Sequence, residues 1–194
     1  MMAMKATTGT TFNFDANYWY TANTLNPTDL TRNNADAKYD VMNYFTAKDI
    51  FAIWPDIANS STESGSIDNL TNWSWLQNNF HNSGATTTLI SKFVASPTQS
   101  TIETSTNGSI SFTGFGTPFS KQVGYAFYGF NYTGNSGAKV RWGFAWNNET
   151  DQNTNDVSGG IGMAMGNYSA GDYVGCCQTQ TGINRKARVE LYIR

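Results

Sequence analysis

Few residues in this sequence are of a type and spacing that supports catalysis. His81 is the only histidine, and it lies in the polar stretch NNFHNSG without a nucleophile motif beside it. A serine or cysteine nucleophile that uses histidine as its base would have to recruit this residue. Zinc sites that draw on several cysteine and histidine ligands are excluded by the count of these residues. We therefore expect His81 to be a surface residue.

An oxygen-rich stretch between residues 149 and 156 is the best candidate for a metal site. Asp151, Asn153 and Asn155 have the spacing of the first, third and fifth positions of a calcium-binding loop. The match stops there, because Asp156 stands where such a loop needs glycine and no glutamate occupies the twelfth place. A calcium site is one interpretation, and a solvated loop at one end of a β domain is the one that we favour. The sequence indicates no other cofactor.

The acidic residues give no paired arrangement for glycosidic catalysis, which needs two carboxyl groups in one cleft. The glutamates are scattered and none lies in a supporting motif: Glu63, Glu103, Glu149 and Glu190. The motifs of nucleotide-binding loops, nucleophile elbows and zinc proteases do not occur. Cys176 and Cys177 are adjacent; they either close a strained vicinal disulfide or, as we favour, remain buried thiols on opposite faces of a strand. The sequence predicts a protein that is not an enzyme.

Composition narrows the range of partners. Of the 194 residues, 39% are hydrophobic and only 13% are charged, with asparagine, threonine, serine and glycine in their place. The net charge of −2 is spread along the chain without a basic patch, so no nucleic-acid partner is expected. No apolar run reaches the roughly 20 residues that span a bilayer. The first residues lack the apolar core of a secretory signal, and we expect the chain to be made in a host cytoplasm.

The C-terminal half, residues 86–194, reads as a succession of short strands. Its strongest signal is a hairpin from Gln122 to Trp146, in which two aromatic-rich arms flank a loop that contains glycine and asparagine. Further strands are expected at these places: Thr87 to Val94, Thr98 to Thr104, Ser109 to Phe115, Gly160 to Met165, Tyr173 to Gln178 and Ala187 to Ile193. Such a series predicts a mainly β protein with a C-terminal antiparallel β-sandwich that is jelly-roll-like.

Two of these strands carry a more specific pattern. The strand from Gly160 to Met165 has only small residues on one face, where another backbone or an aromatic ring can approach closely. In the last strand the apolar residues Ala187, Val189, Leu191 and Ile193 alternate with Arg188, Glu190, Tyr192 and Arg194. We expect the first set to face the core and the second to face outward.

The N-terminal part, residues 1–85, is predicted to be an extended arm with one short helix at about 36–54 and long loops. The helix is indicated by an apolar stripe that includes Val41, Tyr44, Phe45 and Phe51. No periodic pattern organises the aromatic residues of the arm, yet these are costly to leave in water. They are expected to bind neighbouring subunits or a shell, together with the tryptophans of the loops: Phe12, Phe14, Tyr18, Trp19, Tyr20, Phe51, Trp54, Trp73 and Trp75.

An aromatic arm from Thr7 to Tyr20, a helix from Asp36 to Trp54 and a glycine- and asparagine-rich sandwich ending in ARVELYIR form one arrangement. It resembles that of tailed-bacteriophage virion proteins, particularly capsid decoration (cement) proteins and small fibre or tail-tip proteins. The resemblance implies a non-enzymatic structural protein in the virion. It also implies a homo-oligomer, most often a trimer, that stabilises the capsid shell through its N-terminal arm.

A carbohydrate-binding β-sandwich is the alternative function. A lectin or host-recognition tip would use loop aromatics to stack on surface glycans, together with the loop from Glu149 to Asp156. A membrane-active β-sandwich toxin is a third hypothesis, and it would need an amphipathic N-terminal helix that the threonine-rich start does not supply. We favour the virion hypothesis, with copies of the same chain and a capsid protein as partners.

Overall fold

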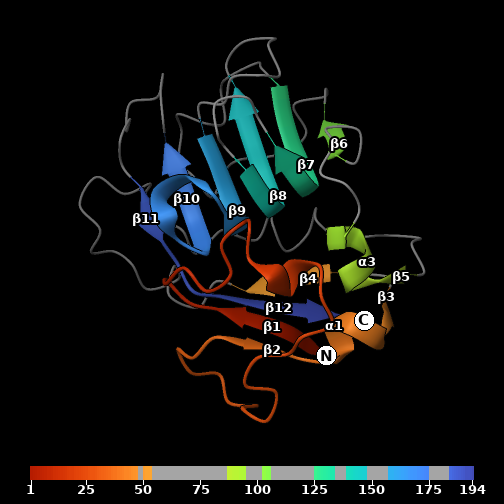
Figure 1. Cartoon of the computed structure of the whole chain (residues 1–194). Helices are drawn as coiled ribbons and strands as arrows, with labels where there is room; N and C mark the ends of the chain where they lie inside the picture. Colours follow the sequence, from red (N-terminus) through yellow and green to blue (C-terminus); the bar gives the residue numbers. More distant parts are fainter. Residues whose placement is uncertain are drawn as a thin grey trace.

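The protein is mainly β-stranded, as the sequence predicts. The computed structural model describes residues 1–47, 50–53, 87–94, 102–105, 125–133, 139–147, 157–174 and 184–194. These residues form a four-stranded, a six-stranded and a two-stranded antiparallel sheet. In Figure 1 the six-stranded sheet stands above the four-stranded one, and the strands of the two sheets run in clearly different directions.

The four-stranded sheet joins the two ends of the chain. Its order is β2 (Ala37–Lys38), β1 (Met2–Ala6), β12 (Val189–Ile193) and β4 (Ile50–Ile53). β1 therefore has neighbours on both sides and is buried along most of its length. The predicted extended arm is wrong for these residues, because the backbone of β1 hydrogen-bonds to β12 and β2. The predicted division into residues 1–85 and 86–194 cuts through this sheet and does not separate two structural units.

The six-stranded sheet is a meander whose strands follow one another in sequence. It runs β6 (Ile102–Ser105), β7 (Tyr125–Thr133), β8 (Lys139–Asn147), β9 (Val157–Met163), β10 (Ala170–Val174) and β11 (Arg185–Lys186). The predicted hairpin is confirmed as β7 and β8, which pair from Tyr125 opposite Asn147 to Thr133 opposite Lys139. A short 3-10 helix, η6 (Met165–Asn167), connects β9 to β10.

The predicted helix at about 36–54 is wrong except for one turn. Helix α1 spans only Val41–Tyr44, and β3 (Thr46–Ala47) and β4 follow it. Asn43 and Thr46 are poor helix formers, and the branched and aromatic residues of β4 suit pairing with β12, where Phe51 lies opposite Tyr192. Tertiary pairing thus overrides the local helical pattern.

The predicted strand from Thr87 to Val94 is also mostly helical. β5 (Thr87–Thr88) pairs with β3, and the chain then turns into α3 (Leu89–Val94). Leu89 and Phe93 are four residues apart and both buried, 3% and 1% exposed. A helix places residues at this spacing on one face, and so does a strand, so the spacing of these two residues alone does not distinguish the two elements.

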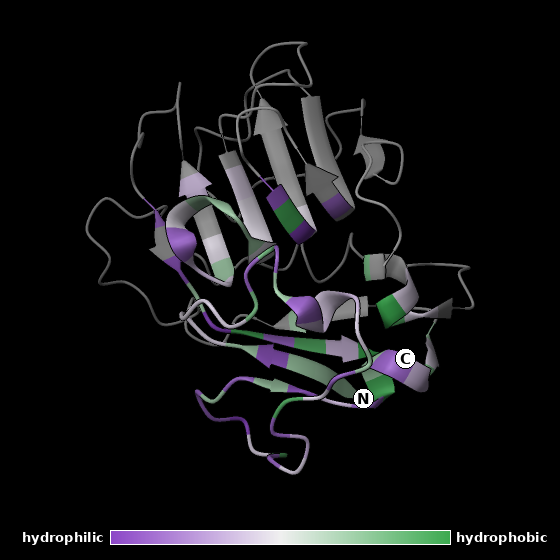
Figure 2. Ribbon diagram, viewed as in Figure 1, coloured by the Kyte–Doolittle hydropathy of each residue, from purple (hydrophilic) through white to green (hydrophobic). Residues whose placement is uncertain are grey.

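The long segment from residue 7 to residue 36, which we call the N-terminal loop, packs on its own chain. It contains one short 3-10 helix, η1 (Asn17–Trp19). The side chains of Phe12 and Trp19 are completely buried, with the Trp19 and Phe93 ring centroids 4.7 Å apart in an edge-to-face contact. The same core cluster includes residues of both large sheets, among them Leu191 and Trp142. Figure 2 shows that hydrophobic and hydrophilic residues are mixed along β1 and β12.

The predicted close approach at the small face of β9 is confirmed. Gly160 has a φ of +139°, and a Cβ there would lie 2.3 Å from the carbonyl oxygen of Trp142 on β8. A Cβ on Gly162 would come 3.0 Å from the ring of Trp19. A neighbouring backbone and an aromatic ring therefore occupy the space that side chains would need, and glycine is required at Gly160 for both its conformation and its size.

Candidate functional site

Buried cationic side chains fix the N-terminal loop to the two sheets. In the described part of the chain they are Lys5, Lys38, Arg141 and Arg188, none more than 7% exposed. Each donates hydrogen bonds to backbone carbonyl oxygens of the loop. Buried ammonium and guanidinium groups need such partners, because an unpaired charge in the interior is strongly unfavourable. The arrangement holds a 30-residue segment of little regular structure in one conformation.

Lys5 lies in a cage of oxygen atoms at the tip of the loop. Its Nζ donates to Asp29 Oδ2 at 3.0 Å, to the Thr31 carbonyl oxygen at 2.7 Å and to Asn33 Oδ1 at 2.8 Å. Hydrogen bonds from Thr31, then from Lys5 and Asn33, hold the pKa of the Asp29 carboxyl well below its usual range. Asp29, Thr31 and Asn33 have the one-three-five spacing that we considered as a calcium pattern at Asp151. In this loop a lysine ammonium fills the cage.

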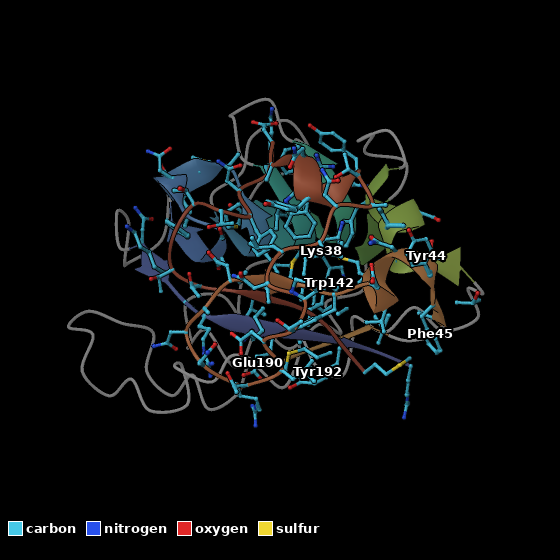
Figure 3. All side chains as sticks on the ribbon, turned by 60° about the horizontal axis from the view of Figure 1, so that its bottom comes forward. Lys38, Tyr44, Phe45, Trp142, Glu190 and Tyr192 are labelled. Atoms are coloured by element: carbon cyan, nitrogen blue, oxygen red, sulfur yellow. The ribbon has the colours of Figure 1, made fainter. Side chains whose placement is uncertain are left out.

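A second charged cluster lies beside the first. Glu190 is completely buried on β12 and is the pairing partner of Lys5. Its Oε2 accepts hydrogen bonds from Arg32 Nε at 2.7 Å and from the Tyr192 hydroxyl at 2.8 Å, and its Oε1 lies 3.3 Å from Arg188 Nη2. Hydrogen bonding to Glu190 and its charge raise the pKa of Arg32. Glu190 and Tyr192 are labelled in Figure 3.

Arg188 holds the backbone of the same stretch. Its Nη1 donates to the carbonyl oxygens of Arg32 at 2.9 Å and of Asn33 at 2.7 Å. The Tyr39 hydroxyl donates to the carbonyl oxygen of Asp29. Arg188, just before β12, and Tyr39, just after β2, therefore fix the backbone on both sides of Leu30. The Leu30 N–H itself donates to the Thr28 carbonyl oxygen at 3.1 Å.

Lys38 fixes the part of the loop around η1. Its Nζ donates to the carbonyl oxygens of Tyr18 at 2.7 Å and Thr21 at 2.5 Å. Burial lowers the pKa of Lys38 to about 8, against the opposing charge of Asp40. Carbonyl oxygens accept from a neutral amine as well as from an ammonium, so these contacts can survive deprotonation. The role that this geometry supports is to position the loop.

Arg141 joins the loop to β8. Its Nε donates to the Phe14 carbonyl oxygen at 2.8 Å, and its Nη1 donates to Asn131 Oδ1 at 3.0 Å and to the Phe93 carbonyl oxygen at 3.2 Å. The guanidinium carbon lies 4.1 Å from the centroid of the Phe14 ring, which adds a cation–π contact. Burial is the main cause of the lowered pKa of Arg141.

The residues predicted to bind neighbouring subunits divide into three groups. Phe12, Phe14 and Trp19 are at most 3% exposed within their own chain, so their assignment as contact residues is wrong. Tyr18 packs partly buried against the core, with its ring centroid 5.3 Å from that of Phe12, and Tyr20 is 49% exposed. The remaining predicted site residues lie outside the described side chains: Phe51, Trp54, Trp73, Trp75, Asp151, Asn153 and Asn155.

Two exposed apolar side chains stand out that the sequence did not single out as contact residues. Leu30 is 76% exposed in the fixed part of the loop, and Tyr44 is 71% exposed at the end of α1. Figure 3 shows Tyr44 and Phe45 together on one side of the molecule, away from Glu190 and Tyr192. In the long helix that the sequence predicts, Tyr44 belongs to the apolar stripe. The observed helix α1 ends at Tyr44 and leaves this side chain exposed. Among the described residues, no group of three or more histidine, cysteine, aspartate or glutamate residues could hold a metal ion.

Searches with the sequence and with the structure found no matching family model, no matching curated protein and no matching solved structure. In the part of the chain that the structure describes, no helix is both long and apolar enough to cross a membrane.

Proposed function

We propose that the protein is a non-enzymatic structural protein of a virus particle, which assembles with copies of itself and stabilises a capsid shell in the manner of a decoration protein. One observation supports this proposal above the others: Leu30 is held exposed between Asp29, which the buried Lys5 binds, and Arg32, whose carbonyl oxygen the buried Arg188 binds. A pre-ordered loop loses little conformational entropy when it binds. Exposed apolar side chains on such a framework suit a permanent protein contact.

The mode of attachment differs from the one expected at the outset. A flexible arm would order its aromatic rings on the partner, whereas Phe12 and Trp19 already lie in the core of this chain. The proposed contact uses the outer side of the N-terminal loop and of α1. In Figure 1 the segment that leads from η1 to β2 extends beyond the edge strand β2 at the bottom of the view, where a partner can reach it.

The charged groups of the region support a structural role over a catalytic one. Lys5 and Arg188 donate hydrogen bonds to the loop, and Glu190 forms ion pairs with Arg188 and with Arg32 of the loop. We also propose that the two large sheets form a sandwich-like pair around the shared core cluster. The sequential strand order of the six-stranded sheet favours a meander over a jelly roll for that layer.

The association with a particle can be tested directly. We expect the native chain to co-sediment with virus-sized particles in a density gradient, at a fixed ratio to the main shell protein by quantitative mass spectrometry. Particles stripped of the chain should release their genome at a lower temperature, and re-addition of purified protein should restore the original temperature. A chain that stays entirely in the low-mass fractions would contradict the proposal.

Carbohydrate binding is the second candidate, and the exposed rings of Tyr44 and Tyr20 favour it. Tyrosine rings at the surface can stack on the apolar faces of sugars. Binding on a glycan array that is lost in the Tyr44→Ala variant would support this function. Binding by that variant at the level of the wild type would exclude Tyr44 as the sugar contact.

A further inference from the structure

Leu30 belongs to a small surface that combines an apolar side chain with a positive charge. The neighbouring Arg32 side chain is 56% exposed, although its Nε is held by Glu190. Arginine has five N–H donors, and the contact with Glu190 uses Nε. We call Leu30 and Arg32 the loop knob. Its backbone is fixed by Lys5, Arg188 and Tyr39, so the knob keeps its shape in the free chain.

A second surface has the opposite charge. Tyr44 is 71% exposed at the end of α1, and Phe45 next to it is partly exposed. Asp40 stands at the start of the same helical turn, is exposed, and makes no side-chain capping hydrogen bond. We call Asp40, Tyr44 and Phe45 the helix patch. It offers aromatic surface beside a carboxylate.

We propose that the loop knob of one copy docks on the helix patch of a second copy, with Leu30 against Tyr44 and Phe45 and with Arg32 facing Asp40. The two surfaces match in kind, because each pairs an apolar element with one charge, and the charges are opposite. Such complementarity fixes partner and register. This inference rests on the self-assembly proposed above and names the contact that carries it.

The position of the two surfaces determines the kind of assembly. The knob belongs to the loop below β2, and the helix patch lies to one side, at α1 (Figures 1 and 3). Because each copy has one surface of each kind, a contact that uses one knob and one patch per pair of copies is head-to-tail. Contacts of this type close into rings when the rotation between copies permits.

The experiment measures the mass of the full-length protein by sedimentation velocity over a range of concentrations. We expect the wild type to reach a multiple of the 21.3 kDa chain mass. Leu30→Ser and Tyr44→Ser should each weaken self-association by about 30-fold or more, as for residues that dominate an interface. Both residues are exposed, so circular dichroism and the urea midpoint should not change. Tyr20→Ser, which removes an exposed ring outside both surfaces, is the matched control and should associate like the wild type.

Mixing the two defective variants tests the head-to-tail arrangement. Leu30→Ser keeps an intact helix patch and Tyr44→Ser keeps an intact knob, so a one-to-one mixture should form a pair that neither variant forms alone. Asp40→Lys removes no apolar surface but places a lysine opposite Arg32 of the second copy. This variant should therefore also fail to assemble.

The outcomes separate this inference from the proposed function. A wild type that remains at 21.3 kDa at every concentration contradicts the proposed self-assembly itself. An oligomeric wild type whose association is unchanged by Leu30→Ser or Tyr44→Ser overturns the assigned contact and leaves self-assembly standing. Two dissociating variants that do not pair on mixing show that the two surfaces do not meet each other.

Discussion

Replacement of Trp19 by alanine should strongly destabilise the isolated chain. The side chain is completely buried, its ring contacts those of Phe12 and Phe93, and its Nε1 donates to the Asn13 carbonyl oxygen at 2.7 Å. A buried tryptophan removes roughly 150–250 Å² from water, which corresponds to about 4–6 kcal/mol at 25 cal/mol per Å². Truncation of large aromatic residues in protein cores costs about 3–5 kcal/mol. We therefore expect a loss of about 4 kcal/mol.

The measurement is urea unfolding followed by far-ultraviolet circular dichroism, at a concentration where the chain is monomeric. A domain of this size has a free energy of unfolding of about 5–15 kcal/mol, so the loss should be large and easily measured. Trp19→Phe keeps a ring against Phe93 but is smaller and loses the hydrogen bond to the Asn13 oxygen, which still accepts from the Ala16 N–H at 3.1 Å. This variant should cost about 1–3 kcal/mol. The neighbouring and exposed Tyr20 serves as control, and Tyr20→Ala should change stability by less than about 0.5 kcal/mol.

The same variants separate the two views of the N-terminal segment. If the segment were a free arm that orders only on a partner, Trp19→Ala would lower binding and leave the stability of the monomer unchanged. A loss below about 1 kcal/mol would therefore refute the burial argument. Deletion of residues 2–20 is not a clean alternative, because it removes strand β1 from the middle of the four-stranded sheet.

Three further predictions follow from the described contacts. Gly160→Ala should lower the free energy of unfolding by about 2 kcal/mol or more, because its φ of +139° is strained for alanine and the new Cβ would meet the Trp142 oxygen. The control is Gly9→Ala, where a Cβ makes only an ordinary contact of 3.7 Å. This control should leave the free energy of unfolding unchanged in the same urea titration. Burial lowers the pKa of Lys38 from 10.5 to about 8, so the unfolded chain binds a proton between these values that the folded chain has released. The free energy of unfolding should then rise from about pH 8 to about pH 10, and Lys38→Met should flatten that rise. The pKa of Asp29 is lowered from its ordinary value of 3.8, so its contribution to stability is present above that value and lost as the pH falls below it; Asp29→Asn should show a shallower loss in acid.

The central hairpin and the last strand of the C-terminal half were predictable from local sequence. The hairpin of β7 and β8 follows from two aromatic-rich arms and a glycine-containing loop. The apolar residues expected to face the core at the end of the chain, Ala187, Val189, Leu191 and Ile193, are all buried. The period of two in a strand is a local property, and sequence reasoning captures it well.

The polar face of the same strand shows where local reasoning fails. Arg188, Glu190 and Tyr192 were expected to face outward, yet Glu190 is completely buried and Arg188 is 7% exposed. The cover comes from Arg32 and Asn33, more than 150 residues earlier in the chain. Alternation defines the two faces of a strand but does not reveal that a distant loop shields one of them.

The aromatic residues of the N-terminal loop were misassigned for a related reason. They lack periodicity because the loop has little regular structure, and a sequence without periodicity does not reveal burial against a distant part of the chain. Their partners are distant in sequence: the Phe12 N–H donates to Ser169 Oγ at 2.8 Å, and the Phe14 N–H donates to the Met163 carbonyl oxygen at 3.2 Å. A local signal was nevertheless present, since Asp29, Thr31 and Asn33 have the spacing of an oxygen cage, which Lys5 fills.

Hydrogen–deuterium exchange of the native protein at low and high concentration tests the account most directly. We expect the amides of Phe12, Phe14 and Lys38 to exchange slowly at both concentrations, because their acceptors lie in the same chain. Residues 29–32 and 40–45 should gain protection only at the concentration where the chain self-associates. Protection of residues 12–19 that arises only on association would contradict the burial of these residues within their own chain. An assembly that leaves residues 29–32 and 40–45 unprotected would contradict the proposed contact between copies.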